Sequence, residues 1–211
     1  GVQSLAHGSG GTGGTILVER ELPWSNDAGA AGRAGAGLGD NGQRWRGEAQ
    51  LLWRGDAAAL RADASAAEFD DYTDGDGEAV RSGFRRRALH LMAGRDLGEA
   101  GVLELGVERA ETLDARFAGA GMDAPLDRMT GARLAWRREL AGGDLAVRAW
   151  RNEVEHVMDN FSLRPQPMMA MRVPATSDTQ GGDLRFAADA GDWSLTLGLD
   201  VAANRRQATR F

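Results

Sequence analysis

Residues 192–201 read Asp-Trp-Ser-Leu-Thr-Leu-Gly-Leu-Asp-Val, and apolar side chains alternate with polar or small ones throughout. Because successive side chains of a β-strand point to opposite faces, this stretch predicts a strand with one apolar and one polar face. The same alternation recurs at 48–54, 103–108 and 183–189. It also runs through the Ala-rich residues 57–67, which we predict to be a strand although their composition favours a helix. The sequence therefore predicts an all-β chain.

The connections between the predicted strands alternate in length. Short turns are expected near 55–56, 95–101, 141–144 and 190–192, and longer polar loops near 70–82, 114–127 and 159–182. Outer-membrane barrels have short turns at one rim and long loops at the other, whereas a soluble β-sandwich or propeller has no reason to keep this asymmetry. Trp53 and Trp193 lie beside short turns, where an interfacial aromatic girdle is expected. We predict an antiparallel transmembrane β-barrel. A soluble structural or adhesion β-protein is the alternative from another class.

The composition excludes several classes of function. The 211 residues include 25 Arg but no Lys, and 31 acidic residues give a net charge of −6, which disfavours a nucleic-acid partner. Without Lys the chain has no phosphate-binding loop and no Schiff-base chemistry, and without Cys it has no disulfide and no thiol nucleophile. No window of about 18 apolar residues could form a transmembrane helix. We predict that the chain is not an enzyme and carries no prosthetic group.

The N-terminal residues differ from the rest. A Gly-rich loop at 8–14 precedes a predicted strand at 15–20, and an Ala- and Gly-rich linker follows. Gly8, Gly10 and Gly13 match a dinucleotide-binding pattern, but a strand follows where that motif requires a helix, so we reject a nucleotide site. The chain begins without Met, and we interpret it as an internal fragment. The expected divisions are a small-domain remnant at 1–22, a linker at 23–35 and barrel strands at 36–211.

Two possible metal ligand sets are weak. The acidic loop at 70–78 does not fit an EF-hand, because Ala79 stands where Gly is required and Arg85 where the bidentate Glu belongs. We therefore predict a solvated acidic loop. His7 and His90 have no obvious partner in the sequence.

His156 is different, because thioether groups surround it in the sequence. Met158 is two residues away and points to the same side of a strand, and Met168, Met169 and Met171 follow in the next loop. Imidazole and thioether together favour a soft ion, above all Cu(I), and we expect the loop methionines to act in its capture. The alternative is that these Met side chains pack the loop against a core. The phase of the strand that begins near residue 145 turns the even-numbered positions toward the lumen.

Several stretches resemble the TonB-dependent outer-membrane receptors, and in particular their copper-receptor branch. Residues 2–10, running into 14–21, are similar to the end of the family's plug domain. Three stretches resemble the copper receptors specifically: 70–75 (Asp-Asp-Tyr-Thr-Asp-Gly), 116–123 (Arg-Phe-Ala-Gly-Ala-Gly-Met-Asp) and 156–161 (His-Val-Met-Asp-Asn-Phe). The His-x-Met pair, followed by Asp-Asn and a Met-rich loop, is the most specific of them. The resemblance covers essentially the whole chain but only part of the family's length.

The resemblance implies a fold, a cargo and partners. It implies a plugged barrel of about 22 strands, of which the chain would contain the end of the plug and about nine barrel strands. In the family, copper is held between plug and barrel, and the His-x-Met pair supplies the barrel share, which we assign to His156 and Met158. The plug share, a Cys and a Met, would precede Gly1, as would the segment that engages the inner-membrane TonB complex.

A bacterial outer-membrane location, surrounding lipid and a monomeric state are implied as well. Within the family, the alternative is a siderophore receptor, which would bind its iron chelate through aromatic and Arg side chains in the loops.

Overall fold

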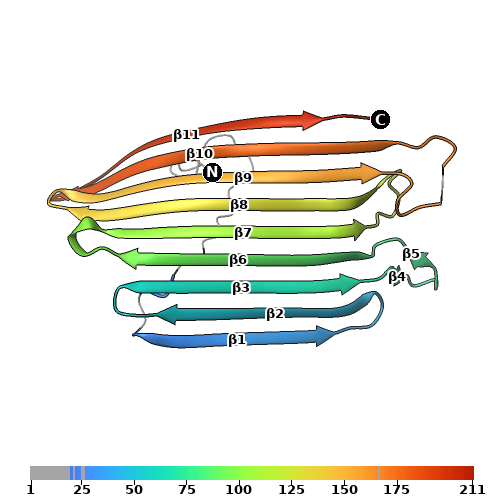
Figure 1. The fold of residues 1–211 in the computed structure, drawn as a ribbon, viewed down its shortest axis with the longest axis horizontal. Helices are drawn as coiled ribbons and strands as arrows, with labels where there is room; N and C mark the ends of the chain where they lie inside the picture. Colours follow the sequence, from blue (N-terminus) through green and yellow to red (C-terminus); the bar gives the residue numbers. More distant parts are fainter. Residues whose placement is uncertain (1–19, 21, 25–26, 166) are drawn as a thin grey trace.

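The computed structural model describes residues 20, 22–24, 27–165 and 167–211. In this part of the chain, nine strands form one antiparallel sheet in which each strand lies beside the next (Figure 1). They are β1 (Gly29–Leu38), β2 (Gln43–Arg54), β3 (Ala58–Phe69), β6 (Phe84–Asp96), β7 (Val102–Ala115), β8 (Asp123–Leu140), β9 (Gly143–Asp159), β10 (Arg172–Ala190) and β11 (Trp193–Ala208). A separate ribbon consists of β4 (Tyr72–Thr73) and β5 (Ala79–Val80), and a short 3-10 helix, η2, spans Gly98–Ala100.

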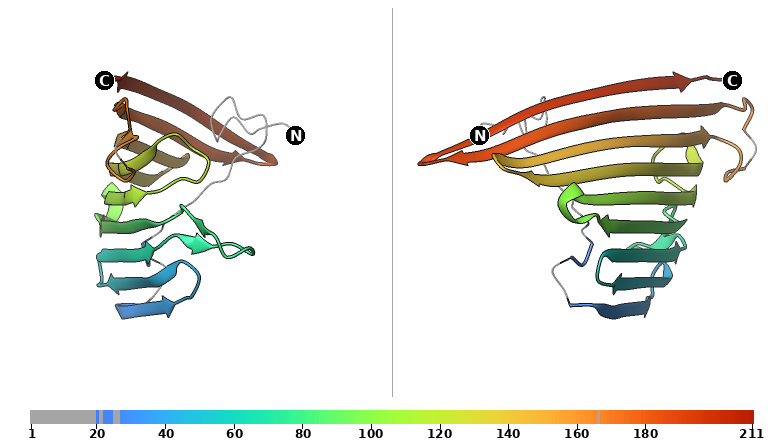
Figure 2. Two further views of the ribbon diagram at one scale, coloured as in Figure 1. Left: turned by 90° about the vertical axis from the view of Figure 1, so that its right-hand side faces the viewer. Right: turned by 60° about the vertical axis from the view of Figure 1, so that its left-hand side comes forward.

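The predicted all-β fold and antiparallel sheet are confirmed, and the Ala-rich residues 57–67 lie almost entirely within β3. None of the described residues belongs to a helix that is long and apolar enough to cross a membrane. The sheet twists progressively from β1 to β11 (Figure 2), as L-amino-acid strands do.

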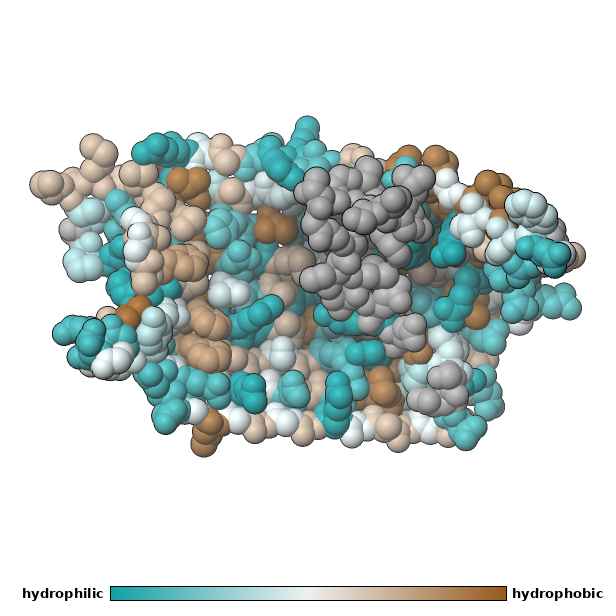
Figure 3. All heavy atoms as spheres, turned by 180° about the vertical axis from the view of Figure 1, so that it is seen from behind, coloured by the Kyte–Doolittle hydropathy of each residue, from teal (hydrophilic) through white to brown (hydrophobic). Residues whose placement is uncertain are grey.

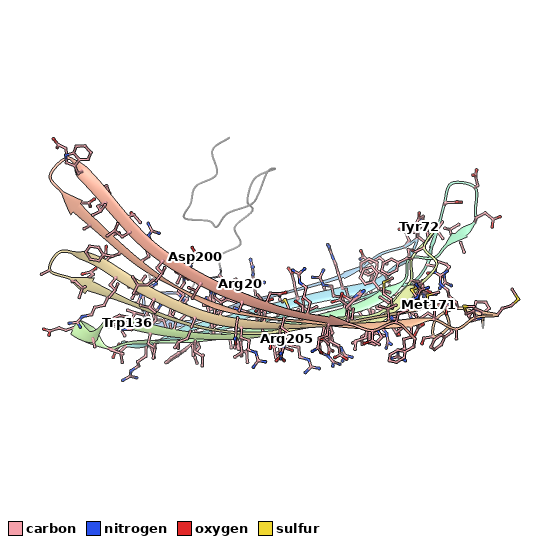
Figure 4. The ribbon with its side chains drawn as sticks, turned by 90° about the horizontal axis from the view of Figure 1, so that it is seen from above. Arg20, Tyr72, Trp136, Met171, Asp200 and Arg205 are labelled. Carbon is pink, nitrogen blue, oxygen red and sulfur yellow. The ribbon has the colours of Figure 1, made fainter. Side chains whose placement is uncertain are left out.

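The sheet is curved, and its two faces differ in chemistry. β11 carries Leu197 on the convex face and Thr196 on the concave face, as the alternation predicts. Figure 4 shows the curvature from above, with Arg205 on the convex side and Arg20 on the concave side. Hydrophilic side chains are spread over the concave face (Figure 3).

Large apolar side chains cover the convex face and remain exposed. They come from strands along the whole sheet: Leu51, Trp53, Leu60, Leu89, Leu91, Leu103, Leu105, Val107, Leu134, Leu184, Trp193, Leu195, Leu197, Leu199 and Val201. A globular protein in water buries most residues of these types. A continuous exposed apolar surface of this kind indicates a face that contacts another apolar phase or partner.

The two ends of the sheet carry connections of different length. At one end, on the left of Figure 1, the turns are short and span 55–57, 97–101, 141–142 and 191–192. At the other end, which we call the loop rim, the long loops span 70–83, 116–122 and 160–171, with one short turn at 39–42. The third long loop is shorter than we expected, because β10 begins at Arg172 and pairs with β9 where the sequence suggested a loop up to residue 182.

β1 begins at Gly29, within the segment 23–35 in which we expected a linker, and not at residue 36. Its residues are mostly Gly and Ala, so the side chains give no contrast in hydropathy, yet the backbone pairs with β2 along the whole strand. The Gly-rich loop at 8–14 and nearly all of the strand predicted at 15–20 lie outside the described residues. The assignment of 1–22 to a separate domain stays a prediction.

Arg20 and Leu22–Trp24, which we call the anchor segment, lie against the concave face. Leu22 forms a small apolar core with Ala59 of β3 and Met92 of β6, and Trp24 packs against it. Gly94 makes room for both side chains, because a Cβ there would stand 2.5 Å from Leu22 and from Trp24.

Polar contacts fix the anchor segment further. Arg20 pairs with Glu108 (3.6 Å), the Arg20 carbonyl accepts from Arg133 (3.0 Å), Trp24 Nε1 donates to Glu104 (2.6 Å), and the Trp24 carbonyl accepts from Arg54. The segment is therefore joined to β2, β7 and β8 as well as to its apolar core.

Trp150 of β9 lies on the concave face, although most side chains there are polar. It is accommodated by Gly181 on β10, its direct partner across the strands. A Cβ at Gly181 would stand 2.6 Å from the indole and 2.6 Å from the Val201 carbonyl oxygen. The missing side chain at Gly181 lets the indole lie along the wall.

If the convex face contacts lipid, as the sequence predicts, Leu197→Arg should destabilise the assembled protein by roughly 2–4 kcal/mol, because a guanidinium would enter the apolar band. Thr196→Arg is the matched control, since Thr196 faces the concave side, and its effect should be much smaller. The free energy of unfolding in lipid vesicles, measured by urea titration, tests the difference. Equal losses for the two variants would contradict the assignment of the faces.

Candidate metal site and the loop rim

His156 and Met158, which we call the rim pair, lie at the end of β9 beside the loop rim. Both side chains face the concave side and are half-buried. His156 lies between Asp127 on β8 and Ala175 on β10, and Met158 lies opposite Val173. The two side chains point to the same face of the strand, as predicted. Their role as metal ligands stays a prediction.

Asp127 contacts the imidazole of His156. The His156 Nδ1 atom lies 2.9 Å from Oδ2 of Asp127. A carboxylate only accepts hydrogen bonds, so Nδ1 is the nitrogen that donates, and Nε2 is the ring nitrogen that can offer a lone pair to a metal. This is the arrangement in which a carboxylate orients a metal-binding histidine. Sequence reasoning missed Asp127, because 29 residues separate the two and only the register of β8 and β9 brings them together.

The loop methionines are not gathered at the rim pair. Met168 and Met169 are exposed to solvent, whereas Met171 is half-buried just before β10 (Figure 4). Asn160 fixes the base of the loop: its Nδ2 donates to the Met169 carbonyl (3.0 Å) and its Oδ1 accepts from the Met171 N–H (2.8 Å). Two thioethers are therefore free to meet an approaching ion.

Hard metal ions find no ready site in the part of the chain that the structure describes. No group of three or more His, Asp or Glu side chains there could hold a metal ion. In the acidic loop, Oδ1 of Asp74 is occupied by the N–H groups of Asp76 and Glu78, each at 3.0 Å.

Met129 is a further thioether near the rim pair. It lies two positions from Asp127 on the concave side of β8, and strand alternation could have identified it.

A second His-x-Met pair, His90 and Met92, lies on the concave side of β6, and we call it the wall pair. The sequence offered no partner for His90, but its Nδ1 lies 3.4 Å from Oδ2 of Asp63 on β3. Met92 is buried, and its sulfur accepts from Nη2 of Arg133 at 3.3 Å. A cavity of about 740 Å³ between the anchor segment and the wall is lined in part by His90.

One fully buried carboxylate, Asp123, holds the three long loops together. Arg164 donates to it twice, at 2.8 and 2.9 Å, the Phe117 N–H donates at 3.0 Å, and Arg81 donates as well. Each of these three partners comes from a different long loop. Burial raises the pKa of the Asp123 carboxyl, but the hydrogen bonds from Arg164, Phe117 and Arg81 outweigh it and hold the pKa below its ordinary value. We call Asp123, Arg81 and Arg164 the rim clasp.

Two other aspartates brace the same rim. Asp71 accepts from the N–H groups of Ser82 and Gly83, each at 2.9 Å, and from Arg116 at 2.8 Å. Asp159 is fully buried and accepts from the N–H and the hydroxyl of Ser162, at 2.8 and 2.6 Å. The loops are therefore built around two buried carboxylates and one half-buried carboxylate, and Arg81, Arg116 and Arg164 are engaged by them.

Comparison with known proteins finds a likeness in structure alone. No protein-family model matches the chain, and no curated protein does. Among solved structures, the chain is similar to the copper transporter OprC, with a TM-score of 0.81 and 26% sequence identity. The match covers 91% of this chain and 30% of that one, so the chain spans less than a third of the length of that protein. The curved sheet is thus a fold that a transporter also has.

Asp123→Asn should loosen the long loops and lower the free energy of unfolding by about 1–3 kcal/mol, because an amide cannot replace a carboxylate between two guanidinium groups. Since the folded pKa of Asp123 lies below its unfolded value near ~4, the stabilisation is present above about pH 4 and is lost as the pH falls through the folded pKa.

Pepsin cleavage of the loops in the full-length protein, followed from about pH 5 to about pH 2, measures this effect. The variant should be cut faster than the wild type at the higher pH, and the two rates should converge at the lowest pH. Asp76→Asn removes an exposed carboxyl of the same rim and is the control. Equal rates for wild type and Asp123→Asn at every pH would exclude the clasp.

Proposed function

We propose that this chain is part of a TonB-dependent outer-membrane receptor that imports copper. The convex face would contact lipid and the concave face would line the lumen. The short-turn end would face the periplasm and the loop rim the exterior. The exposed apolar surface, the asymmetry of the two ends and the likeness to the copper transporter OprC support this class of function.

The observation that carries the copper proposal is the geometry of the rim pair. His156 and Met158 are two residues apart in one strand, which is about 7 Å along the strand, and both face the lumen side. One ion can therefore meet an imidazole nitrogen and a thioether sulfur without strain in the backbone. This donor set suits Cu(I) and suits calcium or magnesium poorly.

Asp127 prepares the rim pair for this task. Its hydrogen bond to Nδ1 holds the ring in place and leaves Nε2 as the nitrogen that binds copper. The exposed Met168 and Met169 would capture the ion before it reaches the rim pair. A Cys and a Met of the plug, expected before Gly1, would complete the coordination, and the TonB complex would supply the energy that moves the plug and releases the ion inward.

The alternatives have less support. A siderophore receptor would need free Arg and aromatic side chains at the rim, but Arg81, Arg116 and Arg164 bind aspartates of the loops. A soluble structural or adhesion protein would leave the large apolar convex face in water, which is unfavourable at about 25 cal/mol for each Å².

The double variant His156→Ala/Met158→Ala removes both members of the rim pair. It should abolish copper retention by the purified full-length receptor, because the two copper ligands proposed on β9 are lost. Assembly should be intact, since neither side chain faces lipid. Asn152→Ala/Val154→Ala changes the two preceding concave positions of β9 and is the control. Copper content after loading and gel filtration is the measurement. Unchanged copper in the rim-pair variant would leave the siderophore receptor as the better reading.

Asp127→Asn should weaken copper binding by about 10–100-fold, because the amide no longer fixes the tautomer and orientation of the imidazole. Asp127→Glu should restore part of the affinity. Nitrogen NMR of labelled His156 adds a test that does not depend on copper, since the wild type should carry its proton on Nδ1. Asp183→Asn, at an aspartate that pairs with Arg148 on the concave side, is the control and should leave the affinity unchanged. A wild-type ring protonated on Nε2 would contradict the role of Asp127.

A further inference from the structure

The wall pair repeats the arrangement of the rim pair. In both, a His and a Met two residues apart face the concave side of one strand. In both, an Asp lies directly opposite the His on the neighbouring strand: Asp63 opposite His90, and Asp127 opposite His156. The Asp contacts Nδ1 in each case, at 3.4 and 2.9 Å. Both imidazoles are thus oriented with Nε2 away from the carboxylate.

Asp63 is itself held in place. Its oxygens accept from Gln50 at 2.6 Å and from Arg61 at 2.7 Å, so the carboxylate that orients His90 cannot turn freely. The wall pair therefore has the groups that orient a copper-binding histidine: a ring nitrogen that can bind the ion, a carboxylate that orients the ring, and side chains that hold the carboxylate in place.

The two pairs differ in what covers them. The rim pair is half-buried at the end of β9, whereas Met92 of the wall pair is buried, because Leu22 packs on it and Arg133 donates to its sulfur. The anchor segment, which supplies Leu22, is itself held in place by the hydrogen bonds of Trp24 with Glu104 and Arg54. Removal of the anchor segment would uncover the side chain of Met92 toward the cavity that His90 already lines.

The wall pair also lies farther into the lumen. β6 runs from Phe84 at the loop rim to Asp96 at the short-turn end, and His90 is six residues from each. The adjoining cavity of about 740 Å³ extends to Arg148 and Trp150 on β9. An ion that leaves the rim pair and moves inward would therefore reach the level of the wall pair.

We propose that His90 and Met92 form a second Cu(I) site, which the anchor segment covers at rest and uncovers when it moves. The inference rests on the proposed function, because it takes copper as the cargo. Copper would pass from the rim pair to the wall pair only after the anchor segment has left the concave face. A thioether and an imidazole on the same face of one strand suit Cu(I).

The test uses the full-length protein and Ag(I), a soft ion like Cu(I) that does not change its oxidation state. Leu22→Ala/Trp24→Ala removes the cover. This variant should retain one more Ag(I) per protein than the wild type, measured by elemental analysis after gel filtration. Adding His90→Gln/Met92→Leu should remove the extra ion, whereas adding His156→Gln/Met158→Leu should remove only the ion at the rim. The carbon resonance of the Met92 methyl group should shift with Ag(I) in the uncovered protein and not in the wild type.

A second uncovering variant guards against loss of folding. Arg54→Gln/Glu104→Gln removes the two wall partners of Trp24 without changing the wall pair or its apolar core, and it should gain the same ion. If the wild type retains an ion at the rim pair and neither uncovered variant gains one, the second site is refuted and the proposed function stands. If the wild type already binds Ag(I) at Met92, the covering role is refuted. If no form retains Ag(I) or copper, the proposed function itself fails.

Discussion

The register between neighbouring strands is the constraint on which both faces of this sheet depend. Backbone hydrogen bonds fix the register, and because side chains alternate, a shift of one residue would move the whole apolar set to the other face. The same shift would turn His156 and Met158 to the convex side and take them away from Asp127. The exposed apolar face and the candidate metal ligands are therefore not separate properties. One pattern of backbone pairing determines both.

Features that depend on near neighbours in sequence could be predicted. The alternation in β11 and the His-x-Met spacing needed no knowledge of pairing, and the structure agrees with both. Contacts between strands and loops could not be predicted: Asp127 lies 29 residues from His156, and Asp123 lies 42 and 41 residues from Arg81 and Arg164. Strand lengths and stagger determine which of many carboxylates meets which cation. β1 was missed for another reason, since Gly and Ala differ too little in polarity to mark two faces.

The loop rim and the concave wall use carboxylates in different ways. At the rim, Asp123 is fully buried between arginines and links three loops into one unit. On the concave face, Asp63 and Asp127 each contact Nδ1 of a histidine on the neighbouring strand. The first use gives rigidity to loops that lie outside the main sheet, and the second orients an imidazole ring. The same residue type thus stabilises the loop rim and orients histidines on the concave face.

The glycines of the concave face determine how close to the sheet the neighbouring side chains lie. At Gly181 the indole of Trp150 lies flat, and Gly106 and Gly131 give the same room to Arg133 and Asn152. A methyl group at any of these positions would tilt the neighbouring side chain away from the sheet and into the space on its concave side. The width of that space is then set by positions that have no side chain at all, and it could narrow in evolution without any change to a polar residue.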